Sequence, residues 1–176
     1  LASLAAAHLR AVPFENLDVA LGRPIAIDPA AWERKVVRDR RGGFCYELNG
    51  LFGCLLEALG FRVARLSAGV WSDERHAFGP EFDHLALRVD LPEGPQLVDV
   101  GFGDGPDGPL RLATDVDQDD GNGRYRLRED GGRLVLERAR EDAWTPVYSL
   151  SPRPRDLAEF AERCRWQQTD PTSPFV

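Results

Sequence analysis

The first third of the chain carries hydrophobic residues at the spacing of α-helices. Residues 1–11 are rich in Ala and Leu and contain no helix-breaking residue. Asp28, followed at once by proline, is typical of a helix start, because its side chain can cap the first turn. A further helix is predicted over residues 45–59, and Gly60 follows as its stop. Its apolar stripe comprises Leu48, Leu51, Phe52, Leu55, Leu56 and Leu59. A helical domain is therefore expected over residues 1–60.

Beyond Gly60 the hydrophobic period falls to two, which is the spacing of half-buried strands. Strands are predicted at residues 61–70, 85–91, 96–100, 124–129, 133–138 and 145–150. The sequence Asp130-Gly131-Gly132 between two of them is typical of a hairpin turn. Residues 154–166 return to helical spacing. Helices followed by strands indicate an α+β fold, with a strand domain over 61–150 and a connecting segment over 151–176.

Charge and composition narrow the possible partners. The chain has 176 residues and a net charge of −7, all of it carried by residues 61–176. Net acidity argues against nucleic acid as the main partner, and no apolar run is long enough to span a membrane. The three cysteines form no CxxC pair, so we expect free thiols and a cytoplasmic protein.

Two stretches imitate ligand-binding motifs without the context that those motifs need. Residues 103–108 match GxGxxG, but Pro106 and Pro109 disfavour the helix that would hold a pyrophosphate. Residues 115–119 resemble the start of a calcium loop, yet its later positions lack the required glycine and glutamate. No ligand pair has the spacing of a structural zinc site, so no metal is expected.

The segment 41–49, RGGFCYELN, is the most informative part of the chain. Its two glycines allow a tight turn and close backbone approach before the helix starts. Cys45 is then in the first helical turn, where unpaired N–H groups and the helix dipole favour a thiolate. Cys54 and Cys164 are interpreted as buried core residues within apolar stripes. Apart from Arg41, the basic residues upstream are interpreted as a solvated helix face: Arg34, Lys35, Arg38 and Arg40.

A base and its orienting carboxylate are predicted downstream of the cysteine. His84 opens one predicted strand, and Asp99 lies near the end of the next. If residues 91–94 connect the two strands as a hairpin, Asp90 pairs with Pro95, and His84 becomes a diagonal neighbour of Asp99. A carboxylate in a mostly buried strand needs a partner, and His84 can supply it. From patterning alone, a structural His–Asp pair and a catalytic one are equally good interpretations.

These motifs together resemble the arylamine N-acetyltransferase family. RGGFCYELN around Cys45 is similar to the nucleophile motif of that family, while DHLALRV around His84 and VDVGFGD around Asp99 are similar to its His and Asp motifs. The spacings of 39 and 15 residues between them also suit the family. PFENLDV within residues 12–19 and the stretch 167–175 extend the resemblance over nearly the whole chain.

The resemblance implies a papain-like arrangement, in which a helical domain carries Cys45 and a β-barrel domain carries His84 and Asp99. It also implies transfer of an acetyl group from acetyl-CoA to an arylamine or hydrazine through an acetyl-cysteine intermediate. The residues agree with that chemistry, because a thiolate can attack a thioester while His84 moves protons and Asp99 fixes the imidazole tautomer.

Further roles follow only from the resemblance. Phe14 and Phe102 would line an aromatic acceptor pocket, and Gly103 would allow close approach of the CoA arm. Arg41 and Glu15 would pair and support the site. Relatives in the family are longer, and a short N-terminal piece and the C-terminal lid domain have no counterpart in this sequence.

Other functions remain open at this point. An amide synthase that releases a polyketide by forming an internal amide would use the same chemistry, and the family contains such enzymes. A cysteine hydrolase could use the same triad with water as the acceptor. A non-enzymatic protein could keep the Cys–His–Asp cluster for structural reasons.

Overall fold

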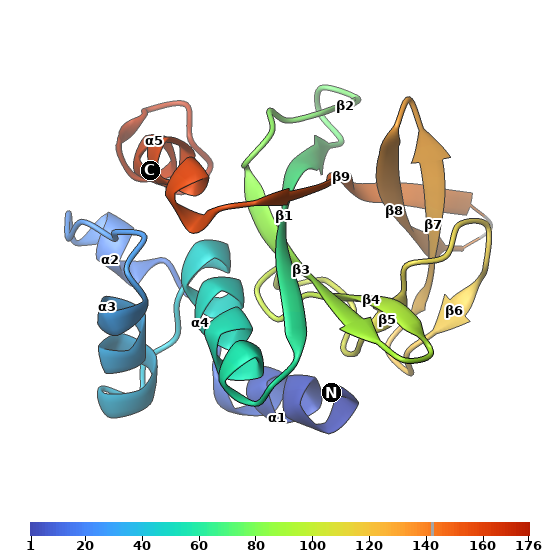
Figure 1. Ribbon diagram of the computed structural model, residues 1–176. Helices are drawn as coiled ribbons and strands as arrows, with labels where there is room; N and C mark the ends of the chain where they lie inside the picture. Colours follow the sequence, from blue (N-terminus) through green and yellow to red (C-terminus); the bar gives the residue numbers. More distant parts are fainter. Residues whose placement is uncertain (142) are drawn as a thin grey trace.

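The computed structural model, which describes residues 1–141 and 143–176, places a group of helices beside a strongly curved antiparallel sheet (Figure 1). The helical part comprises α1 (Ala2–Ala11), α2 (Leu17–Ala20), α3 (Pro29–Glu33), a π-helical turn (Arg34–Arg38) and α4 (Cys45–Ala58). The Asp28 side chain accepts a hydrogen bond from the Ala30 amide, as expected for a cap. Gly60 has a φ of +88° just after α4, which is the conformation that ends a helix at glycine.

Within the described residues the sheet has nine strands and forms a nearly closed barrel. Their bounds are β1 (Arg62–Ser72), β2 (Ala77–Phe78), β3 (His84–Leu91), β4 (Gly94–Val98), β5 (Leu110–Arg111), β6 (Gln118–Asp119), β7 (Arg124–Asp130), β8 (Arg133–Arg140) and β9 (Ala143–Arg155). The order is β5-β4-β3-β1-β9-β8-β7-β6, with β2 paired to β1. The Gln118 side-chain amide bonds the Arg111 backbone N–H and C=O at 2.7 and 3.0 Å, which brings the two ends of this order together.

The strands predicted from the period-two pattern are all present, and the expected α+β order is confirmed. Asp130 pairs with Arg133 around Gly131 and Gly132, both with positive φ, so the predicted hairpin is confirmed. The short strands β2, β5 and β6 were not predicted, because two-residue segments carry too little pattern. Residues 103–108 form an irregular loop between β4 and β5.

The prediction of one helix over residues 154–166 is wrong at its start. Pro154 pairs with Leu66, so it still belongs to β9. A 3₁₀ turn (Leu157–Phe160) follows and leads into α5 (Ala161–Thr169). Glu159 accepts a hydrogen bond from the Asp156 amide at 2.8 Å, which fixes the start of the first helical turn at Leu157, three residues later than predicted.

The predicted apolar stripe of α4 is only half correct. Leu48, Phe52 and Leu56 are fully buried, but Leu55 and Leu59 are 45% and 55% exposed. The helix is buried on a further face that carries small residues instead. A side chain at Gly50 would collide with the ring of Trp32, so glycine allows this close packing, which a search for large apolar residues cannot detect.

Strand β3 separates the two hydrophobic cores. Leu85, Leu87 and Val89 face the helices, whereas Ala86 faces the barrel interior, as the alternation along a strand requires. Asp90 pairs with Pro95, which confirms the predicted register; the turn is shorter than expected because Leu91 also pairs with Gly94. The residues that precede β3 and follow β4 therefore lie at one end of the sheet, beside the start of α4.

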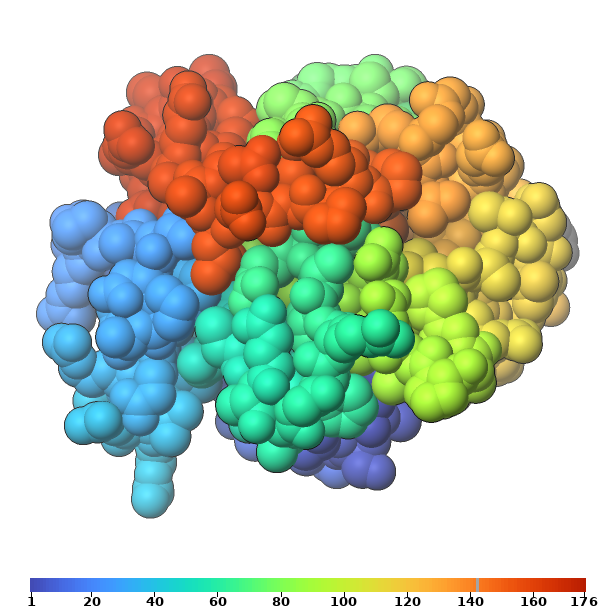
Figure 2. All heavy atoms as spheres, in the orientation of Figure 1, coloured from blue at the N-terminus to red at the C-terminus, as the bar shows by residue number. Residues whose placement is uncertain are grey.

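The C-terminal segment lies across the helical part. In Figure 2, β9 and the helices after it, orange to red, cover the upper end of α4 and touch the lighter blue segment around α2 at the left. The Gln168 side chain joins the two by bonding both the N–H and the C=O of Ile25, at 2.7 and 2.9 Å. None of the helices in the described ranges has the length and apolar character needed to cross a bilayer.

Candidate active site

Cys45 is the first residue of α4, and only 4% of it is exposed. The segment before it runs beside the strand-like stretch around Phe14, because the backbone N–H of Glu15 donates to the Gly43 carbonyl at 2.9 Å. A Cβ atom on Gly42 would lie 2.0 Å from the Pro13 carbonyl oxygen, so only glycine fits there. The close approach predicted for the two glycines is thus present, and it sets where the helix begins.

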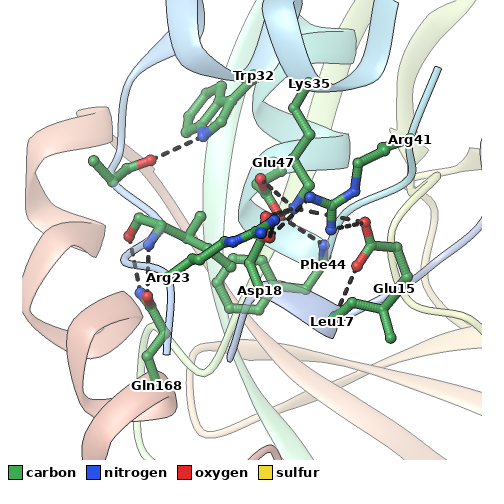
Figure 3. A network of polar contacts seen from close by, with 12 residues as sticks. Glu15, Leu17, Asp18, Arg23, Trp32, Lys35, Arg41, Phe44, Glu47 and Gln168 are labelled. Carbon is green, nitrogen blue, oxygen red and sulfur yellow. Dashed lines mark hydrogen bonds and ion pairs between the residues drawn. The ribbon is translucent and has the colours of Figure 1, made fainter. Parts of the chain in front are cut away.

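Beneath the start of α4 lies a cluster of ionised side chains (Figure 3). Lys35 Nζ is 2.9 Å from both carboxylate oxygens of Glu47 and 2.9 Å from Asp18. Arg41 completes the cluster with contacts of 2.8 Å to Asp18 and to Glu15. Glu47 also accepts the Phe44 amide at 3.1 Å, so the cluster is joined directly to the first turn of the helix.

The interpretation of Lys35 as part of a solvated helix face is wrong. Its side chain is 11% exposed, because the π-helical turn directs it inward toward the carboxylates. Burial would lower the pKa of Lys35, but hydrogen bonds to Asp18 and Glu47 outweigh it and raise that pKa. The pattern of basic residues could not identify Lys35, since its partners come from segments far apart in the sequence.

His84 and Asp99 are in contact. The Nε2 atom of His84 lies 2.7 Å from Oδ2 of Asp99, and both side chains are almost completely buried. Asn49, one turn after Cys45, donates to the other carboxylate oxygen of Asp99 at 2.8 Å and to the Leu85 carbonyl at 2.7 Å. With Nε2 directed at a carboxylate, the Nδ1 atom of His84 is the one left to accept a proton.

The hydrogen bonds around Asp99 keep it ionised. Burial alone would raise its pKa, but His84, the Asn49 amide and the Gly101 N–H outweigh this and lower the pKa below its usual value. Asn49 is the last residue of the segment RGGFCYELN, but no role was predicted for it from the sequence. Its position four residues after Cys45 was the available signal, because that spacing puts both on one face of a helix.

Cys45 and His84 line the same cavity, of about 690 Å³. Burial, followed by the charge of Asp99, raises the pKa of the Cys45 thiol well above its ordinary value. Backbone hydrogen bonds near the helix start act in the opposite direction and lower that pKa. A thiolate there requires that a base such as His84 take the proton.

One wall of the cavity is aromatic. Phe14, 38% exposed, and Phe102 line it together with Phe175, whose ring centroid lies 6.3 Å from that of Phe14. Phe102 packs edge-on against His84, with ring centroids 5.1 Å apart. Gly103 follows with a φ of +88° and open space around it, but it is not among the described residues that line the cavity.

The cavity also has a polar lining that comes mainly from α5. Asp83, Arg163 and Gln167 line it, next to the indole of Trp166. No shared role could be assigned to these residues from the sequence, because nothing in a single sequence joins residue 83 to a helix 80 positions later. Across the described parts of the chain, no group of three or more His, Cys, Asp or Glu side chains could hold a metal ion.

Comparison with known proteins identifies the family and the fold. The sequence profile of a family described as N-acetyltransferase matches residues 1–176. The arylamine N-acetyltransferase of Mycolicibacterium smegmatis is 40% identical over 99% of this chain, and the match covers 65% of that protein. The structure of the Mycobacterium marinum arylamine N-acetyltransferase in complex with CoA superposes with a TM-score of 0.93 at 40% identity, covering all of this chain and 67% of that one. The Salmonella typhimurium arylamine N-acetyltransferase gives a TM-score of 0.94 at 36% identity over 99% of this chain and 64% of its own.

The chain thus spans about two thirds of the length of its relatives, and it belongs to the arylamine N-acetyltransferase family.

Proposed function

We propose that the protein transfers an acetyl group from acetyl-CoA to the nitrogen of an arylamine or hydrazine, with Cys45 as nucleophile. The observation that carries this proposal is the His84–Asp99 pair at 2.7 Å, opening onto the same cavity as a cysteine at a helix start. The CoA complex of the M. marinum relative supports a CoA-linked donor. Free cysteines at 45, 54 and 164 suit a reducing cytoplasm.

In the first half-reaction, His84 Nδ1 accepts the proton of the Cys45 thiol. The sulfur attacks the thioester carbonyl carbon, the bond from that carbon to the CoA sulfur breaks, and CoA leaves with the proton from His84. Asp99 holds the imidazole in one tautomer and stabilises the imidazolium. The exchange of one thioester for another is nearly balanced in energy, so the acetyl-cysteine can form readily.

In the second half-reaction, the amine nitrogen attacks the acetyl carbon on Cys45. His84 removes the proton from the nitrogen, the carbon–sulfur bond breaks, and the proton returns to the sulfur. The aromatic wall formed by Phe14, Phe102 and Phe175 suits a flat acceptor ring. Arg41 and Glu15 act at a distance, by holding the segment that carries Phe14 against the start of α4.

Mass spectrometry of the intact protein after mixing with acetyl-CoA tests the proposal. We expect one added acetyl group on Cys45 that disappears when an arylamine is supplied, and no adduct in Cys45→Ala. Asp99→Asn should retain the fold and lose most of the rate, since the same change in a serine-protease triad costs about 10⁴-fold. Turnover of amide or ester substrates without acetyl-CoA would instead favour a cysteine hydrolase. An adduct on another residue would exclude the proposed nucleophile.

A further inference from the structure

Asp83, the residue directly before His84, forms a short ion pair with the last helix. Its Oδ1 atom accepts hydrogen bonds from Arg163 Nε at 2.6 Å and from Gln167 Nε2 at 3.1 Å. The two charged side chains are only 8% and 19% exposed, and Arg163 also stacks on the Trp166 ring at 3.5 Å. A charge pair this close to the imidazole, on the wall of the reaction cavity, has no part in the acyl transfer described above.

The backbone at the same point is strained and tightly held. Phe82 has a φ of +72°, in the left-handed region that a bulky side chain rarely adopts. The Tyr46 hydroxyl holds this turn by donating to the Phe82 carbonyl at 2.7 Å and lies 3.3 Å from the Asp83 carbonyl. The Cys45 sulfur lies 4.0 Å from that same carbonyl. The turn before His84 is therefore fixed on one side by the helix that carries the nucleophile and on the other by α5.

The charges that face His84 come from several elements. Asp99, directly after β4, contacts the imidazole, Asp83 precedes it in the chain, and Cys45 lines the same cavity. Arg163 on α5 and Arg75 in the β1–β2 turn supply the nearby positive charge, and Glu74 and Tyr148 complete the set. Burial raises the pKa of Asp83, while Arg163, Arg75 and His84 all oppose that rise, so Asp83 and His84 influence each other electrostatically.

We infer that Asp83 and Arg163 are positioning residues of the acyl-transfer site: their ion pair holds His84 at Cys45 and balances the negative charge next to the imidazole. The inference rests on the proposed use of His84 as the base for Cys45. Without Asp83, the positive charge of Arg163 faces His84 uncompensated and disfavours the imidazolium. When both charges are removed, the net charge beside His84 is the same as in the wild type, but the ion pair that joins the turn before His84 to α5 is lost.

The test is the pH dependence of Cys45 alkylation by iodoacetamide in the intact protein, followed by mass spectrometry. The acid limb is the low-pH part of the profile, where the alkylation rate rises with pH. We expect Asp83→Asn to shift this acid limb to lower pH by about 0.5–1 unit, because the unpaired Arg163 cation then disfavours a protonated His84. The double variant Asp83→Asn, Arg163→Gln should return the limb to its original position with a lower plateau rate. Arg163→Lys keeps the charge, so it should keep the limb and lower only the plateau.

Arg126→Gln is the matched control, because it breaks an equally short ion pair, 2.7 Å to Glu137, on β7 and β8. Neither its limb nor its plateau should change. A limb that stays in place or rises in Asp83→Asn overturns the inference, as does a double variant that keeps the shift. If thermal unfolding shows that Asp83→Asn is not folded, Asp83→Ser takes its place in both the single and the double variant, because it removes the same charge. Alkylation needs no acetyl-CoA, so this result is independent of whether the acetyl adduct forms.

Discussion

Replacing Lys35 by Met should destabilise the protein far more than the loss of an ordinary lysine. The ammonium group lies 2.9 Å from both Glu47 and Asp18, and the three side chains are 11%, 2% and 10% exposed. Arg41 remains to neutralise Asp18, so the uncompensated charge is that of Glu47. Breaking a buried pair by removing one partner costs about 3–5 kcal/mol, and we expect a loss in that range.

The loss of unfolding free energy in Lys35→Met should be larger at high pH than at low pH. Burial already raises the pKa of Glu47, and without Lys35 it rises further above the value in the unfolded chain. A carboxyl with a raised folded-state pKa is most favourable below its unfolded pKa, and its contribution is lost as pH rises through the folded pKa. Lys35→Met should therefore be closer to wild type at about pH 5 than at about pH 8.

Urea unfolding at both pH values measures these differences. A loss of 3–5 kcal/mol corresponds to a drop of roughly 10 °C in Tm for a chain of this length. The double variant Lys35→Met, Glu47→Gln should recover part of the loss, because glutamine keeps the cap on Phe44 without the charge. Arg38→Ala, which removes an exposed pair with Glu33, is the control and should cost less than about 1 kcal/mol. A Lys35→Met protein within 1 kcal/mol of wild type at about pH 8 would refute the assignment of a buried charge cluster.

Three further outcomes follow from single positions. Asn49→Ala removes an amide that bonds three buried groups, so urea unfolding should show a loss of about 2–4 kcal/mol and alkylation of Cys45 should slow. Burial lowers the pKa of His8 to about 4, so stability should fall by about 2 kcal/mol as pH drops from 6.5 to 4, and His8→Phe should remove that pH dependence. Gly42→Ala should fail to fold stably, since its Cβ would lie 2.0 Å from the Pro13 carbonyl oxygen, whereas Gly108→Ala, with open space around it, should behave as wild type.

The parts of the site that depend on local periodicity could be predicted from the sequence. Alternation along β3 and β4 sets which side chains share a face, and an even-numbered connection preserves that face even when the register is slightly wrong. This is why the pairing of His84 with Asp99 could be predicted from the sequence, although the hairpin turn is shorter than expected. The start of α4 followed in the same way from two glycines and a helical stripe.

The parts that depend on contacts between distant segments could not be predicted. Lys35 looked like its exposed neighbours because burial is a property of the π-helical turn and of carboxylates from other segments. Arg163 and Asp83 meet only because β9 carries α5 back across α4. Leu55 was expected inside on hydrophobicity alone, but the space on that side of α4 is left open to solvent in this structure.

Asn49 couples the packing of α4 to the geometry of the candidate site. Its amide donates to the Leu85 carbonyl on β3 and to Asp99 after β4, while its oxygen accepts the Val100 N–H at 2.9 Å. One side chain on the helix that begins with Cys45 therefore fixes its distance from both strands of the pair. Gly101 permits that distance, since a Cβ there would lie 3.1 Å from the Cα of Cys45. Any substitution that moves α4 away from this end of the sheet must displace the thiol and release the carboxylate at the same time, so losses of stability and of reactivity should occur together at these positions.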